Sequence, residues 1–382
     1  MIKVCILTSV HPPFDVRIFH KEAKSLLMAG YDLSIIAQHD KDEIINGIKI
    51  FHLPRPQNRL ERMTKLIWLI FWKAIRINAH IYHIHDPELL PAGFLMKLLG
   101  KKIIYDMHEN LPKQIMNKEW INSRLRNILS TIVYVLERLS LMFMAVIFAE
   151  CSYRKDYLWI KKCTIVLNMP IINQLFAYKC RTSMKNDFSI GYMGGVTTER
   201  GSVTTLDALK ILKDNNITLR YDCVGPITQP HKRQLLMKCK EYDLKNIYFH
   251  GYLPAHQGWQ VIGHCSIGLA LLHPIPNYIE SYPTKIFEYM AMGIPVIASN
   301  FPLYRRVVEE SHCGICVDPL NPKEIAGAIQ FVIDHPAESK QMGENGYRAV
   351  VERYNWDKEA DKLISFYRCI LSKECTGFNS NE

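Results

Sequence analysis

Two carboxylates eight positions apart, Glu280 and Glu288, bracket a turn and the start of an expected helix. The helix is predicted over Thr284 to Met292, because Pro283 suits a first turn and Gly293 suits the position after a helix end. Backbone N–H groups at such a start lack partners and carry the positive end of the helix dipole. The segment therefore predicts an anion-binding site.

A diphosphate would fit this helix start, with Pro283 and Thr284 beside it and Lys285 adding a full positive charge. Glu288, one turn further, could accept two hydrogen bonds from vicinal ribose hydroxyls, and Glu280 would lie nearer a sugar. The same residues also suit a solvated helix start with Glu280 as its cap, and periodicity alone favours that plainer alternative.

Short β-rich runs alternate with helical patterns along the chain, which is typical of parallel sheets wound in βαβ units. The first strands are expected at Val4 to Thr8, Leu33 to Ala37, Ile81 to Ile84, Ile103 to Tyr105 and Ala145 to Phe148. The pattern restarts with strands at 188–193, 218–224, 247–250, 267–270, 295–298 and 314–317. We therefore expect an α/β protein of two Rossmann-like, doubly wound domains facing a cleft.

The domain boundaries are expected where these patterns stop. The first domain would cover residues 1–180 and the second residues 186–354, divided near the polar stretch from Lys179 to Asn186. An amphipathic helix over 355–372 would pack back on the first domain, and 373–382 would form a flexible tail.

The segment EYMAMGIPVIAS completes a longer motif around the two carboxylates. It resembles the E-x7-E signature of family-four retaining glycosyltransferases of the GT-B fold, and the likeness is specific because helix and following strand match together. The resemblance implies that Glu288 binds the ribose of a nucleotide-sugar donor and that Glu280 sits beside its sugar.

Two other second-domain segments resemble the same family. GYMGGVTTERGSVTTLDAL resembles the turn whose basic residues hold the diphosphate, and Arg200 falls close to the family's Lys position. Gly195 stands where the family usually has Arg, so Lys285 is a candidate substitute. Without the family, Arg200 would be read as a surface charge. HGYLPAHQGW resembles the loop along the nucleotide base, with Tyr252 and Leu253 as its contacts.

In the first domain, TSVHPPFDVRIFHKEAKSL and HDPELLPAG resemble a bacterial polysaccharide-assembly branch of this family. Asp15 and Arg17 are expected in the cleft, contacting acceptor or phosphate, with His85 and Asp86 also on the acceptor side. Asp15 could equally cap the helix that begins near Val16.

His108 follows the strand at 103–105, and the family's His at this point contacts the donor sugar; Glu109 would orient it or face the acceptor. A rival interpretation is a metal-dependent α/β hydrolase. Its ligands would come from the cluster of His83, His85, Asp86, Glu88 and His108, which lacks the H-x3-H spacing of a helical site.

Composition limits the partners. A formal charge of +10 favours anionic partners, and no basic–aromatic pattern indicates nucleic acid. The stretches Arg59 to His80 and Asn127 to Ala149 are unsuited to span a bilayer, but they could lie on an anionic membrane surface or simply pack on their own sheet.

The cysteines and the N-terminus indicate the compartment. Eleven scattered cysteines are typical of free thiols in the cytoplasm, and Val4 to Val10 is expected to be a strand and not a signal peptide. The close pair Cys313 and Cys316 lacks the second pair that a zinc site needs.

The expected function is transfer of a sugar, with retention, from a UDP- or GDP-sugar to a lipid-linked or growing saccharide in cell-surface polysaccharide synthesis. The catalytic residues would be His108, Glu280 and Arg200, with no metal or cofactor. The protein would be cytoplasmic and peripheral on the inner face of the membrane. The alternatives are the hydrolase above and a non-catalytic nucleotide-sugar binding module.

Overall fold

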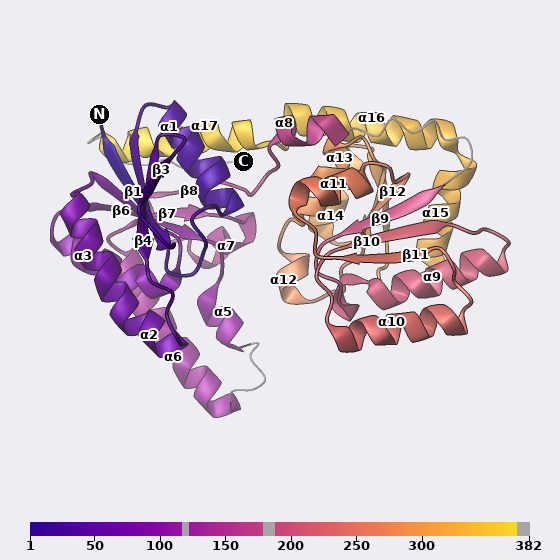
Figure 1. Ribbon diagram of the computed structural model, residues 1–382, viewed down its shortest axis with the longest axis horizontal. Helices are drawn as coiled ribbons and strands as arrows, with labels where there is room; N and C mark the ends of the chain where they lie inside the picture. The colour runs from indigo at the N-terminus through magenta and orange to yellow at the C-terminus, as the bar shows by residue number, and fades with distance from the viewer. Residues whose placement is uncertain (117–121, 179–187, 373–382) are drawn as a thin grey trace. The chain divides into compact units, whose positions relative to one another are not determined.

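The computed structural model describes residues 1–116, 122–178 and 188–372. The chain divides into two compact units, one formed by Met1–Asn168 with Asp357–Glu382 and the other by Met169–Trp356. Figure 1 shows an α/β arrangement in each unit, with helices against a central sheet. We describe the two units separately.

The first unit contains an eight-stranded sheet within its described residues, in the order β3-β4-β2-β1-β5-β6-β7-β8. Its strands are β1 (Lys3–Leu7), β2 (Asp32–Gln38), β3 (Glu43–Ile45), β4 (Ile48–Leu53), β5 (Ile81–Ile84), β6 (Lys102–Met107), β7 (Ala145–Phe148) and β8 (Cys163–Ile165). All neighbours pair in parallel except β3 and β4. The order reverses beside β1, which places the topological switch point between β1 and β5.

Helical segments cover the first sheet. They are η1 (Val16–Ala23), α1 (Lys24–Met28), α2 (Arg59–Glu61), η2 (Arg62–Leu66), α3 (Ile67–Ile77), η3 (Pro87–Leu89), α4 (Leu90–Leu98), α5 (Leu111–Met116), α6 (Ser123–Leu141), α7 (Cys151–Asp156) and α17 (Trp356–Leu371). The central strands are buried along their whole length because helices lie on both faces, so they read as continuous apolar runs.

The sequence missed three strands of this sheet: β3, β4 and β8. The parallel pair β2 and β4 is connected through the short antiparallel strand β3 instead of a helix, so the βαβ pattern has no signal there. β4 alternates between buried and partly buried residues, and β8 has only three residues. Neither forms the long apolar run that identified the central strands.

The C-terminal helix α17 packs on the first unit. The Tyr367 hydroxyl lies 2.8 Å from His83 Nδ1, and Glu359 Oε2 accepts a hydrogen bond of 2.7 Å from the Leu167 backbone N–H. Lys102 Nζ donates to the carbonyl of Ile370 at 2.7 Å. The chain therefore leaves the first unit after Asn168 and returns at Asp357 to complete it.

The second unit contains a parallel six-stranded sheet, in the order β11-β10-β9-β12-β13-β14. Its strands are β9 (Ser189–Met193), β10 (Arg220–Val224), β11 (Ile247–Gly251), β12 (Ile267–Ala270), β13 (Val296–Ser299) and β14 (Gly314–Val317). Each overlaps a predicted strand. The order reverses at β9, so a second switch point lies between β9 and β12.

Helical segments also surround the second sheet. They are α8 (Ile172–Leu175), η4 (Phe176–Tyr178), η5 (Thr198–Arg200), α9 (Ser202–Asp214), α10 (Gln229–Glu241), α11 (Ala255–Ile262), α12 (Pro276–Ile279), α13 (Thr284–Ala291), α14 (Pro302–Glu310), α15 (Pro322–Asp334) and α16 (Pro336–Glu352). The predicted helix over 284–292 is α13, and Gly293 follows it with a φ of 72° that suits glycine.

The unit boundary and one cysteine differ from the sequence-based expectations, and two expected segments lie outside the described residues. Residues from Met169 to Tyr178 belong to the second unit, because α8 packs against α13 there. The expected boundary from Lys179 to Asn186 and the tail 373–382 lie outside the described residues. Cys369 is disulfide-bonded, so the expectation that every cysteine is a free thiol is wrong.

The helices also bear on the membrane question. Among the described residues, we find no helix that combines the length and the apolarity needed to cross a bilayer.

Candidate functional site

The loop after β9 lies at the switch point of the second sheet and is built from glycines. Gly194 has a φ of 136°, and Gly225 approaches it so closely that a Cβ on Gly225 would overlap the Gly194 carbonyl. A Cβ on Gly201, with a φ of 77°, would likewise overlap the Leu271 carbonyl oxygen. Only glycine fits these approaches, and they hold the loop and the start of α9 against the sheet.

Lys285, in the first turn of α13, is only 7% exposed. Its amine lies 4.0 Å from the centre of the Tyr192 ring and has no hydrogen-bond partner among the described residues. Burial first, and then the charge of Arg200, lower its pKa to about 7. Burial of an amine that has no hydrogen-bond partner is unfavourable, so this position favours an anion.

Arg200 converges on the same point. A Cβ on Gly194 would lie 3.1 Å from Lys285 Nζ and 3.5 Å from Arg200 Nη1, and a Cβ on Gly195 would lie 3.6 Å from that Nη1. Arg200 is half-buried, and its Nε donates to the Tyr278 hydroxyl at 3.1 Å. The guanidinium therefore lies beside Gly195, where the family usually has an arginine, and it is not a solvated surface charge.

The helix start of α13 leaves its backbone donors open. Pro283 is the N-cap residue, and no side chain caps the helix. This excludes the alternative in which Glu280 is the cap; Glu280 is exposed, at the end of α12. Thr284 is exposed at the first position of the helix. Glu288 is half-buried one turn further on, near enough for its charge to raise the pKa of Lys285 against the effect of burial.

Tyr252 and Leu253 follow β11 directly, at the same carboxyl edge of the sheet as Gly195. Tyr252 is 75% exposed and Leu253 is partly buried. Their predicted contact with a base remains a prediction.

In the first unit, Asp86 holds the loop after β1. Its Oδ2 accepts hydrogen bonds from Thr8 Oγ1 at 2.8 Å, from the Ser9 backbone at 2.6 Å and from Ser9 Oγ at 3.1 Å. The side chain of His11 lies 3.4 Å from its Oδ1. Because Asp86 is 3% exposed and its oxygens are used inside the domain, the expectation that it contacts an acceptor is corrected to a structural role.

Asp15 and Arg17 also serve the fold. Asp15 Oδ1 accepts from the backbone N–H groups of Arg17 at 2.8 Å and Ile18 at 3.1 Å, so it is the cap of η1. Arg17 is 4% exposed and lies 2.9 Å from both Glu22 and Asp106. Its expected contact with acceptor or phosphate is wrong, because its charge is paired inside the domain.

A buried polar cluster surrounds Arg17. Glu22, His83, His85 and Asp106 each offer a ligand atom within 4.8 Å of the others, so the set resembles a metal site. The guanidinium of Arg17, however, donates to Asp106 and to the Val166 carbonyl and lies against Glu22. The two carboxyls already share this cation, and its positive charge would repel a divalent metal ion here. This set, which shares only His83 and His85 with the cluster of the hydrolase interpretation, therefore does not fit a metal centre.

His108 lies at the outer side of this cluster. Its Nε2 is 3.0 Å from His85 Nδ1 and 3.5 Å from Asp106 Oδ1, and its side chain is 26% exposed. Burial lowers its pKa to about 3, so the ring is neutral at pH 7. His85 is 2% exposed, whereas Glu109, next to His108 in the chain, is exposed.

Sequence reasoning missed Glu22, Asp106 and Tyr192. Asp106 adjoins the segment that contains His108, and its position at the end of a predicted strand was a usable signal. Glu22 lies on the buried side of its helix, three residues after Phe19 and four after Ile18. A charged residue at such a position is unusual and was a usable signal. Tyr192 sits in an apolar strand and gave no signal.

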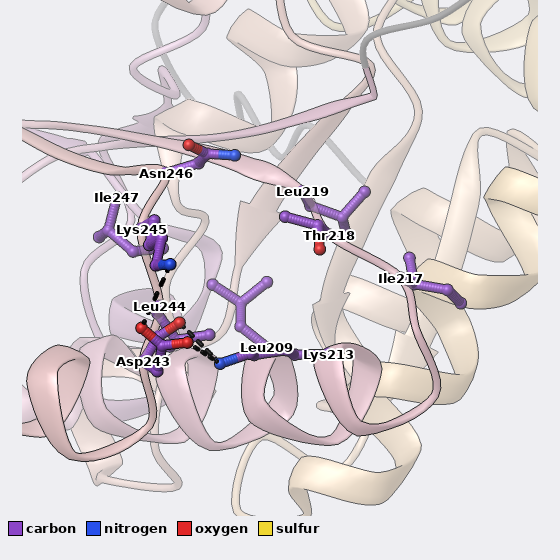
Figure 2. Close-up of a pocket in the computed structure, with 10 residues that line it drawn as sticks. All are labelled: Leu209, Lys213, Ile217, Thr218, Leu219, Asp243, Leu244, Lys245, Asn246 and Ile247. Atoms are coloured by element: carbon purple, nitrogen blue, oxygen red, sulfur yellow. Dashed lines mark hydrogen bonds and ion pairs between the residues drawn. The ribbon is translucent and has the colours of Figure 1, made fainter.

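A separate hollow lies at the other edge of the second sheet. It has a volume of about 190 Å³ and lies where β10 and β11 begin, between them and α9 (Figure 2). Lys213 Nζ pairs with Asp243 Oδ2 at 2.8 Å there, so its main charges are satisfied. Ligands of open parallel sheets bind at the carboxyl edge, and this hollow is therefore not the candidate site.

The pair Cys313 and Cys316 offers no metal site either. Both thiols are free, and burial raises the pKa of each to about 12. They are protonated thiols of β14 and the turn before it, not thiolate ligands.

Known proteins resemble part of this chain in sequence and nearly all of it in fold. Residues 181–349 match the family described as glycosyl transferases group 1. An MMP alpha-(1->4)-mannosyltransferase from Mycolicibacterium hassiacum is 28% identical over 100 residues, which are 26% of this chain and 24% of that protein. The chain thus aligns with about a quarter of the length of the first curated relatives.

The likeness to solved structures extends over nearly the whole chain. Sucrose-phosphate synthase from Thermosynechococcus elongatus has a TM-score of 0.76 and 15% identity, covering 97% of this chain and 99% of that chain. Anabaena HepE in complex with UDP-glucose has a TM-score of 0.71 and 15% identity, covering 96% and 100%. At these identities the likeness establishes the fold alone, and it confirms the predicted two-domain α/β class.

Proposed function

We propose that the chain transfers a sugar from a nucleoside-diphosphate donor to a saccharide acceptor. The proposal starts from the match of residues 181–349 to the glycosyl transferases group 1 model and from the likeness of the fold to solved glycosyltransferase structures. The observation that carries the proposal is the buried amine of Lys285. It lies with Arg200 at the open start of α13 and lacks a hydrogen-bond partner among the described residues.

The diphosphate would fill this position. The helix start and the two cations would stabilise the negative charge that develops as the nucleoside diphosphate leaves, and such preorganised charge is the largest contribution in many enzymes. Glu288 would accept hydrogen bonds from the ribose hydroxyls, Glu280 would lie beside the sugar, and Tyr252 and Leu253 would lie along the base. This arrangement needs no metal, because Lys285 and Arg200 supply the positive charge.

We further propose that the configuration of the sugar is retained and that His108 contacts a sugar hydroxyl. His108 is neutral and partly exposed at the carboxyl edge of the first sheet, which suits a hydrogen bond to a hydroxyl. Glu109 would face the acceptor.

The acceptor would be lipid-linked or a growing cell-surface polysaccharide, met at the cytoplasmic face of a membrane. The support is α6, in which a charged side chain is buried and large apolar side chains are exposed, the reverse of an ordinary surface helix. Glu137 is buried and its Oε1 accepts from the Tyr157 hydroxyl at 2.7 Å, while large apolar side chains point outward. The exposed ones are Leu125, Ile128, Leu129, Ile132, Val135, Leu136 and Leu139.

The neighbouring helices extend this surface. α4 contacts both α3 and α6, so the three helices form one continuous group in the first unit. Trp68 and Trp72 of α3 and Leu98 of α4 are more than half exposed. Apolar side chains of this kind, on a chain with a net charge of +10, suit an anionic bilayer interface.

The test is release of UDP or GDP from a panel of nucleotide-sugars, with and without a membrane extract as acceptor. We expect release that depends on the extract for at least one donor. Binding of a nucleotide-sugar without release would indicate a binding module, and no binding of any donor would refute the proposal.

A further inference from the structure

The imidazole rings of His85 and His108 lie at the outer side of the buried cluster, and one hydrogen bond joins them. His85 Nδ1 and His108 Nε2 are 3.0 Å apart, so one nitrogen must donate and the other must accept. Burial lowers the pKa of both rings, which are therefore neutral and carry one N–H each. The neighbours decide which ring donates.

Glu22 sets the tautomer of His85. Its Oε2 lies 3.2 Å from His85 Nε2, and neither atom has another hydrogen-bond partner among the described residues. A carboxylate at this distance favours the proton on that nitrogen. Once Nε2 carries the proton, Nδ1 has only a lone pair, so the His108 Nε2–H must donate to it. Asp106 Oδ1, 3.5 Å from His108 Nε2, favours the same arrangement.

The other charges around the pair do not reverse this choice. Arg17 is one cation between two buried carboxyls, Glu22 and Asp106, and burial raises the pKa of both carboxyls. Asp106 Oδ2 lies 3.8 Å from His85 Nδ1, which is further than the 3.2 Å between Glu22 Oε2 and His85 Nε2. His83 faces Asp106 at 3.8 Å and bonds to Tyr367, whereas His11 lies on the exposed side with its ring centre 6.2 Å from that of His108.

We propose that Glu22 and His85 are positioning residues that fix His108 as its Nε2–H tautomer, so that His108 offers a ligand only the acceptor Nδ1. The ligand itself, a sugar hydroxyl, rests on the proposed function. His108 would then require a hydroxyl that donates, and a fluorine at that position of the sugar would be rejected as strongly as a hydrogen.

The tautomer can be measured without substrate. In protein labelled with ¹⁵N histidine, long-range proton–nitrogen correlation distinguishes a protonated ring nitrogen from a bare one, and His108→Gln identifies the resonances. We expect a protonated Nε2 and a bare Nδ1 for His108 at pH 7. A protonated Nδ1 on His108 in the unaltered protein would overturn the proposal, whether or not any variant folds.

The Glu22→Gln variant tests the cause. Its amide oxygen would stay with the Arg17 donors, so its NH2 would replace Oε2 and donate to His85 Nε2. Both imidazoles would then exchange tautomers, and His108 would show a protonated Nδ1. The matched control is Glu43→Gln, which removes a carboxylate 2.6 Å from His39 Nε2 elsewhere in the same unit. It should change the His39 resonances and leave the His108 resonances unchanged.

An unchanged His108 tautomer in folded Glu22→Gln would also contradict the proposal. A chain that shows the expected tautomers but transfers no sugar would instead refute the proposed function alone, so the two failures are distinguishable.

Discussion

At the residue scale, the proposed role of Lys285 predicts that anion binding is coupled to proton uptake. Its pKa is about 7 in the free protein, and a bound diphosphate would return it towards its ordinary value. Below pH 7 the amine already carries its charge, whereas above pH 7 binding must first protonate it. We therefore expect the affinity for UDP or GDP to fall as the pH rises from about 7 to 9, with proton uptake measurable by calorimetry in two buffers of different ionisation enthalpy.

The Lys285→Met variant should lose this pH dependence. It should bind the nucleotide about 10- to 100-fold more weakly, because one charged contact is removed, yet be more stable by roughly 1–3 kcal/mol, because no amine is buried. Lys340→Met, an exposed residue of α16 whose Nζ lies 3.8 Å from Glu344 Oε1, is the control and should change neither property. An unaltered pH profile in Lys285→Met would remove Lys285 from the site.

Glu288 makes a separate prediction, which tests its contact with ribose. Glu288→Ala should weaken nucleotide binding by about 2 kcal/mol, and 2′-deoxy nucleotide should bind the unaltered protein more weakly by a similar amount. In a double-mutant cycle the two losses should not add, because they remove one interaction. Additive losses in calorimetric titrations would place the ribose elsewhere; Glu352→Ala, exposed at the end of α16, is the control.

At the element scale, substitutions on α6 test the proposed contact with a membrane. Ile132 and Leu136 are 50% and 59% exposed on its outward face, and burying such side chains in lipid is worth about 1 kcal/mol or more each. We expect Ile132→Ser with Leu136→Ser to lower cosedimentation with vesicles of anionic lipid about tenfold or more. The matched control, Leu236→Ser with Met237→Ser, changes exposed apolar residues of α10 in the second unit and should have no effect.

The elements also show what sequence could and could not predict. Central strands such as β5 and β9 are buried and apolar, so their periodicity located them, and Gly293 located the end of α13. The sequence could not show that Arg17 turns inward, because an arginine beside a helix cap reads the same whether solvent or a buried Glu22 faces it. Pairing across 89 residues, as between Arg17 and Asp106, leaves no local pattern.

At the scale of the whole molecule, the chain leaves the first unit and returns to complete it, which makes the stability of that unit depend on its last helix. Glu359 is 3% exposed, and its Oε2 accepts from the Leu167 backbone N–H. Tyr367 is fully buried against His83 and Tyr31. Both contacts join residues about 190 or more positions apart.

Glu359→Ala should therefore destabilise the first unit selectively. It leaves the partly buried backbone N–H of Leu167 unpaired, which costs about 1–3 kcal/mol, while every donor-site residue in the second unit keeps its contacts. Hydrogen exchange should show faster opening of β1 and β5 with β9 and β12 unchanged, and UDP or GDP affinity should stay within twofold. Asp361→Ala, on the exposed side of the same helix, is the control. Equal loss of protection in both units would mean that they unfold as one cooperative body, and α17 would then stabilise the whole chain instead of completing one unit.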